Sequence, residues 1–269
     1  MIPTENSAWP PAELEHLFAP ITTWAVWYEG DTGKLADLYS GNTTIRPSQL
    51  SGGVVGRIAR WFWGQPVPAG QSKAKTHIPI ARDIARASAT LLFGEELYVD
   101  VEPETAADAA KPKQNPLQDR LNAILDGNRW QSLLPEAGEF CSALGGVYLR
   151  CGWDAAVAQH PLISVVQPDG AIPTFTWGRL TEVTFWQVVR KEGSTVWRHL
   201  ETHQPGWIVH QLYQGTQSNI GTVVPLTEAR QTADLPVNAE SAIETGTPLL
   251  TAVYVPNVKP APLWRGDPI

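Results

Sequence analysis

The spacing of hydrophobic residues changes near the middle of the chain. Up to residue 146, apolar residues recur every three or four positions, which is the spacing of amphipathic helices. After that point, short runs rich in Val, Thr and aromatic residues are separated by turn signals such as Gly193 and Pro205-Gly206, a pattern typical of β-strands. The sequence therefore predicts an α+β fold, with a helical N-terminal half followed by an antiparallel β meander.

The clearest helical pattern covers residues 79–93. Pro79 suits the first position of a helix, and Gly94 is well placed to end it. Arg82 and Arg86 fall on the polar side of this pattern. We therefore expect a buried core helix with a solvated charged side. Its expected buried face consists of Ile80, Ile84, Ala87, Ser88, Leu91 and Leu92.

The other helices of the first half follow an arm, residues 1–10, that we expect to be loose. Pro20 is expected to end one helix or to begin the next, and Pro135 to break or start another. Asp31 and Asn115 are plausible N-caps, because their side-chain oxygens can accept hydrogen bonds from the first free N–H groups. The predicted helices cover residues 13–18, 21–28, 34–39, 117–127 and 131–144.

The β-rich part is expected to form its meander over residues 147–224, because its short runs are joined by short turns. Asp169-Gly170 is a further turn signal, and residues 227–248 are polar and loop-like. The predicted strands are residues 147–153, 162–167, 182–190, 195–201, 207–213, 222–224 and 249–255. The chain thus divides into a mostly helical part (1–146), a β-rich part (147–255) and a proline-rich strap (256–269).

Composition narrows the class of protein. The 269 residues suffice for one or two domains, and the net charge of −7 argues against a sequence-independent nucleic-acid binder. Twelve tryptophans favour large buried contacts or interfaces. The two cysteines, Cys141 and Cys151, are too few for a disulfide framework, and there is no signal peptide or long apolar run. We expect a cytosolic chain with reduced thiols.

No catalytic residue, cofactor site or metal site is expected. His199, His203 and His210 lie close in sequence and could bind zinc, but no Cys or carboxylate completes an obvious ligand set. They are therefore interpreted as ordinary histidines on the surface of a sheet. Cys141 lies on an apolar helix face without a second cysteine nearby. The acidic residues between positions 100 and 108 lack the spacing of a calcium loop and indicate a solvated face.

Several strings along the chain resemble the portal proteins of tailed bacteriophages, of the siphophage type common in actinobacterial phages and prophages. The first half contributes the helix string IPIARDIARASATLLFGEE at 78–96 and WYEGD at 27–31. The second half keeps the order of the family's motifs, none of which is catalytic. These are EFCSALGGVYLR at 139–150, TFW at 184–186, RHLE at 198–201, LYQGT at 212–216, YVPN at 254–257 and LWR at 263–265.

This resemblance implies a subunit of the dodecameric ring at the unique vertex of a phage capsid. Double-stranded DNA is packaged and ejected through such a ring, passing without specific binding, and an acidic channel would repel its phosphates. The implied partners are further copies of the chain, the major capsid protein, the terminase and the head-completion or adaptor proteins. The implied locations are the virion and, during assembly, the host cytoplasm, with no enzymatic activity, cofactor or membrane.

The chain departs from the family at its end. After LWR, family members continue into a stem helix, a clip and a crown, whereas this chain stops at Ile269 and resembles the wing region alone. Because ring subunits meet through unlike faces, we expect Arg82, Arg86 and Trp264 at a subunit interface. The alternative for the two arginines is a solvent-exposed pair or an intrachain ion pair. Two other functions stay open: a monomeric hydrolase-like enzyme with an unrecognised site, and another capsid-associated adaptor protein.

Overall fold

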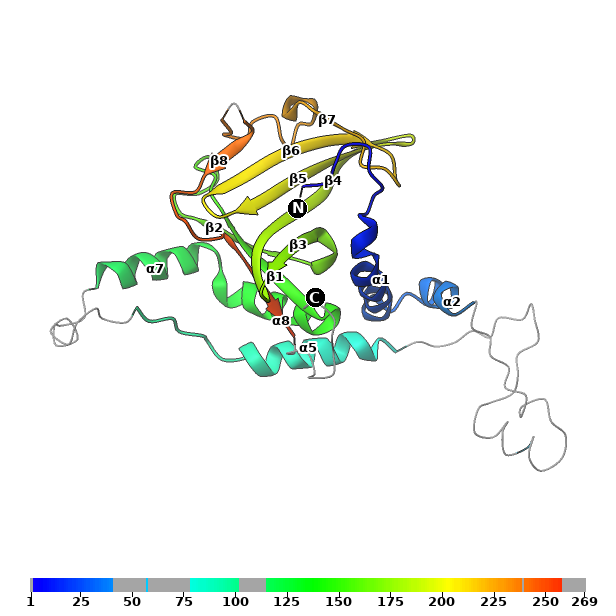
Figure 1. Ribbon diagram of the computed structural model, residues 1–269. Coiled ribbons are helices and arrows are strands. Elements are labelled where there is room, and N and C mark those ends of the chain that lie inside the picture. Colours follow the sequence, from blue (N-terminus) through cyan, green and yellow to red (C-terminus); the bar gives the residue numbers. More distant parts are fainter. Residues whose placement is uncertain (1, 41–56, 58–77, 102–114, 239, 258–269) are drawn as a thin grey trace.

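The computed structural model describes residues 2–40, 57, 78–101, 115–238 and 240–257. In these ranges the first half of the chain is helical and the second half is antiparallel β structure, so the predicted α+β fold is confirmed (Figure 1). None of the described helices is long and apolar enough to cross a membrane. The helices are α1 (Glu15–Glu29), α2 (Thr32–Ser40), α5 (Ile80–Phe93), α7 (Pro116–Gly127) and α8 (Trp130–Leu144).

The strands form two sheets rather than one meander. The predicted meander is correct for the larger sheet, in the order β3-β4-β5-β6-β7 with β8 also paired to β6. The smaller sheet has the order β2-β1-β9. The strands are β1 (Gly146–Gly152), β2 (Leu162–Val166), β3 (Ala171–Thr176), β4 (Arg179–Glu192), β5 (Thr195–Gln204), β6 (Trp207–Gly215), β7 (Thr222–Val224), β8 (Ala242–Glu244) and β9 (Ala252–Pro256).

The sequence pattern missed two of these strands. β3 follows directly on a 3-10 turn, Pro168–Gly170, so the Asp-Gly signal marks a turn between the two sheets rather than a hairpin. β8 is only three residues long and lies inside the stretch that was expected to be a loop. Short strands of this kind depend on pairing with a distant neighbour and leave little local pattern.

The two sheets pack against each other through aromatic residues. The ring of Tyr148 on β1 lies 5.7 Å from the ring of Phe185 on β4, and 4.8 Å from that of Tyr254 on β9. The opposite face of the larger sheet is also covered, because Leu200 and Tyr213 pack with Trp9 from the N-terminal arm. The larger sheet is therefore buried on both faces at its centre.

The N-terminal arm is not loose, contrary to the prediction. Trp9 is 6% exposed, and its ring meets that of Trp186 edge to face at a centroid distance of 5.1 Å. The backbone N–H of Trp9 donates to the carbonyl of Ser218, and the Tyr213 hydroxyl donates to the carbonyl of Pro3. The partners of this arm lie some two hundred positions later in the chain, so local polarity could not reveal its anchoring.

Two prolines sit inside helices that were expected to end or begin at them. A 3-10 turn, Ala12–Leu14, leads into α1, which continues through Pro20, and α8 continues through Pro135. Each proline removes one helical hydrogen bond. The neighbouring side chains of Ile21 and Leu134 are buried, so tertiary packing stabilises both helices despite the lost hydrogen bonds.

The two predicted N-caps are confirmed. The Asp31 carboxylate accepts hydrogen bonds from the backbone N–H groups of Gly33 and Lys34 at the start of α2. These bonds hold the pKa of Asp31 below its usual range. The side-chain oxygen of Asn115 accepts from the N–H of Leu117 at the start of α7. Both caps satisfy N–H groups that have no partner within the helix.

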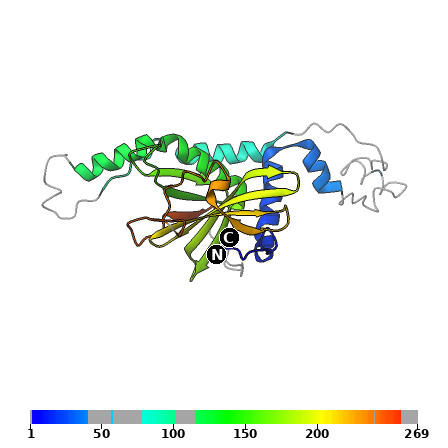
Figure 2. The ribbon, with the colours of Figure 1, turned by 90° about the horizontal axis from the view of Figure 1, so that it is seen from above.

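The helices lie against the smaller sheet in successive layers. α8 packs on β1, and α5 packs on α8, below the sheets in the view of Figure 1 and along one side in Figure 2. The α5–α8 contact is close: a Cβ added to Gly138 would lie 2.7 Å from the Phe93 ring and 3.4 Å from the Cβ of Ala89. α5 is thereby held on the outside of the molecule.

The turn between β3 and β4 offers a test of local strain. Its two central residues, Trp177 and Gly178, have φ angles of 54° and 72°, and Trp177 is 98% exposed. A bulky side chain is disfavoured at positive φ, whereas Asn is well tolerated there. Trp177→Asn is expected to raise the free energy of unfolding by about 0.5–1 kcal/mol in urea titrations.

Gly178→Ala serves as the matched control for this hairpin. It places a Cβ at positive φ in the same turn and is expected to lower the free energy of unfolding by about 1 kcal/mol. Equal or reduced stability of Trp177→Asn would show that the tryptophan makes a stabilising contact in the isolated chain.

Candidate functional site

Helix α5 turns its apolar positions toward solvent, which is the reverse of the prediction. Ile84 is 59% exposed and Leu91 is 87% exposed, whereas Ala85 and Ala89 are 2% and 3% exposed. Apart from Ser88, which is half-buried, the expected buried face is therefore the outer face. We call this outer row the α5 stripe; it consists of Ile80, Ile84, Ala87, Leu91 and Leu92.

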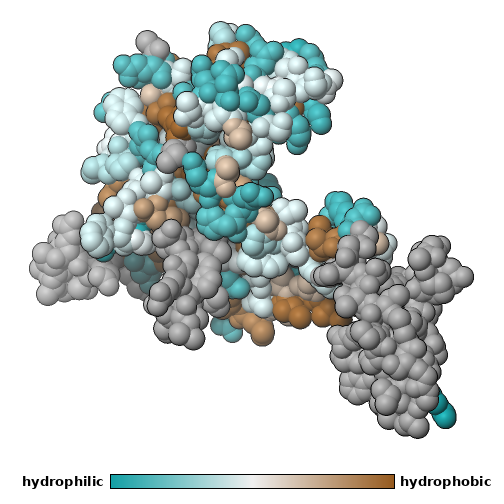
Figure 3. Space-filling model, turned by 45° about the vertical axis from the view of Figure 1, so that its right-hand side comes forward, coloured by the Kyte–Doolittle hydropathy of each residue, from teal (hydrophilic) through white to brown (hydrophobic). Residues whose placement is uncertain are grey.

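The orientation of α5 follows from size rather than hydrophobicity. The small Ala85 and Ala89 are buried on the inner face, and Ala89 lies close to Gly138 of α8, where a Cβ on the glycine would clash with the Phe93 ring. Hydrophobic periodicity ranks Ile and Leu above Ala and so assigns the wrong face. Figure 3 shows apolar residues gathered along the lower edge of the molecule, where α5 lies.

Arg82, expected at a subunit interface, contacts the end of α1 in the same chain. It donates to the backbone carbonyls of Tyr28 and Glu29, and its guanidinium lies 5.6 Å from the centroid of the Tyr28 ring. Cations are favoured at the C-terminal end of a helix, where carbonyl groups lack helical partners. Arg82 therefore attaches α5 to α1.

Arg86 also has a partner within the chain. Its Nε donates to Oε1 of Glu139 on α8 at 3.0 Å, and the same oxygen accepts from the Tyr28 hydroxyl at 2.5 Å. Burial and the hydrogen bond to Glu139 raise the pKa of Tyr28 to about 12. The two arginines thus fix α1, α5 and α8 to one another. The predicted contact with a neighbouring subunit stays a prediction, and Trp264 lies outside the described residues.

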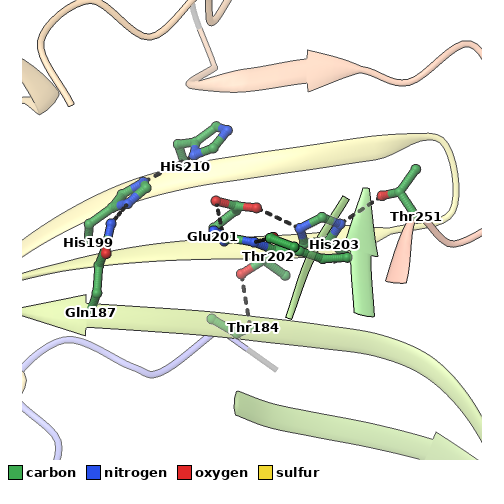
Figure 4. Close-up of polar contacts among 10 residues, drawn as sticks. Thr184, Gln187, His199, Glu201, Thr202, His203, His210 and Thr251 are labelled. Carbon is green, nitrogen blue, oxygen red and sulfur yellow. Dashed lines mark hydrogen bonds and ion pairs between the residues drawn. The ribbon is translucent and has the colours of Figure 1, made fainter. Parts of the chain in front are cut away.

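The three histidines form the second candidate site, and they are not surface residues. His199, His203 and His210 are 5%, 0% and 5% exposed. All three point from the face of the larger sheet that carries Glu201, on the side of the smaller sheet (Figure 4). The interpretation as surface histidines is wrong because it assumed that a polar row on a strand faces water.

The Glu201 carboxylate connects the two sheets. Its Oε2 accepts from the Arg150 guanidinium on β1 at 2.9 Å, and its Oε1 accepts from Nε2 of His203 at 2.7 Å. The other ring nitrogen of His203 lies 2.7 Å from the Thr251 hydroxyl, which precedes β9. Figure 4 shows this series of hydrogen bonds running from β5 to Thr251.

Glu201 stays ionised despite its burial. Burial alone would raise its pKa, but the hydrogen bond from His203 and the nearby charge of Arg150 outweigh it and lower the pKa of Glu201 to about 2. No carboxylate was expected beside the histidines. The signal was present, since polar residues at 199, 201 and 203 alternate along one strand and so share a face.

His199 and His210 form a stacked pair beside this carboxylate. Their ring centroids are 5.2 Å apart, and Nε2 of His199 lies 3.1 Å from Nδ1 of His210. Burial, and then the proximity of His210, lowers the pKa of His199 to about 4, and burial also lowers that of His210. Within the described residues, no group of three or more His, Cys, Asp or Glu side chains is arranged to hold a metal ion.

The histidines and Glu201 predict a specific pH dependence of stability. The pKa of His199 falls from 6.5 to about 4 on folding, and that of Glu201 from 4.5 to about 2. In both cases the unfolded chain binds more protons, so the free energy of unfolding decreases as pH falls. We expect the decrease to begin near pH 6.5 and to continue to about pH 2, as measured by urea titrations at a series of pH values.

Single substitutions separate the two contributions. His199→Asn is expected to reduce the slope of the profile between pH 6.5 and about 4, where the lowered pKa of His210 still contributes, and to leave the lower part in place. Glu201→Gln removes the negative charge shared by Arg150 and His203 and replaces one of its two acceptor oxygens with an NH2 donor, and it is expected to cost roughly 2 kcal/mol or more at neutral pH. A profile for the unmodified chain that is flat down to pH 4 would contradict the assignment of neutral, buried histidines.

In comparisons with known proteins, no protein-family model matches the chain and no curated protein matches it. Two candidate sites remain, the α5 stripe and the cluster around Glu201. The α5 stripe is an exposed apolar surface on a rigidly held helix. The cluster around Glu201 is a buried polar network that joins two sheets.

Proposed function

We propose that the chain is a subunit of a bacteriophage portal, the ring at the unique capsid vertex through which double-stranded DNA is packaged and ejected. The proposal starts from the ordered family motifs on both sides of residue 146 and assigns the chain to the wing region. Its role is mechanical: it assembles with further copies, up to a dodecamer, and no catalytic residue is assigned. The capsid protein, the terminase and head-completion proteins would be its partners.

The observation that carries the proposal is the exposed α5 stripe. Ile80, Ile84, Ala87 and Leu91 follow one another at intervals of four, three and four residues, the spacing that lets one helix pack along another. Leu91 is 87% exposed and Leu92 is 72% exposed in the isolated chain. Contiguous exposed apolar residues of this kind mark surfaces that are covered in an assembly.

The attachment of α5 supports an interface role. Arg82 and Arg86 hold the helix from behind through Tyr28, Glu29 and Glu139, so its outer face is presented with little conformational freedom. A preorganised surface loses less entropy on binding than a mobile one. The net charge of −7 also suits a ring through which DNA passes without adhering.

The alternative function, a hydrolase-like enzyme, has one supporting observation. Thr251, His203 and Glu201 form a hydroxyl–imidazole–carboxylate series with two contacts of 2.7 Å, the order of groups that activates a nucleophile. His203 is 0% exposed and Glu201 is shared with Arg150, which favours a role in joining the sheets. Labelling of Thr251 by a fluorophosphonate probe, lost in Thr251→Val, would support the enzyme.

Assembly through the α5 stripe is tested directly by charge insertion. Native mass spectrometry and negative-stain images of the full chain are expected to show species larger than the 29.4 kDa monomer. Ile84→Glu and Leu91→Glu place a carboxylate on the stripe, and we expect each to shift the population to monomer. Because both positions are more than half exposed, the variants should keep the unfolding transition of the parent within about 0.5 kcal/mol.

Val157→Glu is the matched control. Val157 is 69% exposed but lies in the loop between β1 and β2, away from α5, so this variant should assemble like the parent. A monodisperse monomer for the unmodified chain, or unchanged assembly of both stripe variants, would contradict the proposed function. Assembly into a closed species other than a ring would instead favour a capsid-associated adaptor.

A further inference from the structure

The segment that follows α5 has an unusual means of attachment. Residues 95–101 leave the end of α5 and run beside α7 as an extended chain without belonging to either sheet (Figures 1 and 2). Tyr98 donates its hydroxyl proton to the carboxylate of Glu96 at 2.7 Å. A contact between residues two apart is typical of an extended strand, where these side chains share a face. We call residues 97–101 the edge segment.

Two glutamine side chains hold the edge segment as a neighbouring strand would. The Gln131 amide accepts from the backbone N–H of Leu97 at 3.3 Å and donates to its carbonyl at 3.1 Å. The Gln118 amide donates to the carbonyl of Val99 at 2.8 Å and accepts from the N–H of Val101 at 2.6 Å. Each amide therefore pairs with the backbone in the manner of a peptide group.

The backbone groups that these glutamines bind all belong to odd-numbered residues. In an extended chain, successive residues direct their N–H and C=O groups to opposite edges. The opposite edge is therefore formed by Tyr98 and Asp100. Among the described residues, the backbone groups of these two make no hydrogen bond, and Tyr98 is 78% exposed. Within the described part of the chain, one edge is therefore fixed and the other is open.

We propose that the open edge of the edge segment binds an extended, basic segment of a partner protein by β-augmentation. Such binding uses backbone hydrogen bonds for affinity, and a strand that is already extended loses little entropy when it pairs. The proposal does not require the ring, because the edge segment lies beyond the C-terminal end of the α5 stripe. It assigns a second interaction surface to the chain.

The negative charge of residues 95–101 indicates which kind of segment would bind the open edge. Residues 95–101 contain three acidic side chains, Glu95, Glu96 and Asp100, and no Lys or Arg. Pairing of the edge segment with its copy in a second chain would bring these acids together across the ladder, which is destabilising. A segment that alternates apolar and basic residues would place apolar side chains beside Leu97 and Val99 and cations beside the acids. A basic partner is therefore favoured over self-pairing.

The test uses the full chain and a synthetic peptide, fluorescein-Val-Lys-Val-Arg-Val-Lys-Val-amide, whose fluorescence anisotropy is measured at two salt concentrations. A second peptide of identical charge carries N-methyl groups on consecutive backbone nitrogens, so neither of its edges can complete a ladder. We expect the methylated peptide to bind about tenfold more weakly or worse. Hydrogen exchange at the amides of Tyr98 and Asp100 is expected to slow when the unmethylated peptide binds.

Variants of the glutamines test the attachment. Gln118→Ala combined with Gln131→Ala releases the edge segment without altering its charge, and we expect it to weaken peptide binding about tenfold. Gln159→Ala is the matched control, since this exposed glutamine lies in the loop after β1 and should leave binding unchanged. Circular dichroism of each variant verifies that the fold is retained.

Three results would overturn the proposal. Equal binding of the two peptides would show attraction by charge alone, without strand pairing. Unchanged binding by the double glutamine variant would show that the fixed edge is not required. Absence of binding at millimolar peptide would show that the edge does not accept a strand. None of these results bears on assembly through the α5 stripe, so the two proposals fail independently.

Discussion

The placement of one ionised carboxylate between two sheets constrains the whole β-rich half. Glu201 can be buried only because Arg150 and His203 both bind it, and removal of a charge from water without such partners would be prohibitive. Arg150 comes from β1, and His203, on the same strand as Glu201, contacts Thr251 just before β9, so the two contacts fix the smaller sheet on one face of the larger one. Because α8 packs on β1, and α5 on α8, the position of the outer helix also follows from this contact.

The sequence predicted element types better than it predicted faces. The caps at Asp31 and Asn115, the helix over residues 79–93 and the hairpin turns of the larger sheet depend on local chemistry, and they are confirmed. The face of α5 was assigned wrongly, since close packing of Ala89 and Phe93 against Gly138 depends on a helix about fifty residues away. Local pattern cannot report which of two plausible faces meets a distant partner.

The candidate sites show the same limit for polar residues. Alternation along β5 places His199, Glu201 and His203 on one face, which could be read from the sequence. This face is covered because Arg150 on β1 and Thr251 contact it. The local sequence of β5 does not indicate either contact. The glutamines that hold the edge segment were also missed, because Gln on a helix is ordinarily solvated. In each case, the role of the side chain depends on a contact partner that is distant in the sequence.

The anchoring of the N-terminal arm has a consequence for synthesis of the chain. The ring of Trp9 covers Arg198, and the backbone of the arm pairs with residues 218–221, so a segment synthesised about two hundred residues earlier completes the surface that these later residues form. Contacts with such sequence separation form late, because a long loop must close first. Until then Trp9 is exposed on the nascent chain, where chaperones that recognise aromatic residues could bind it.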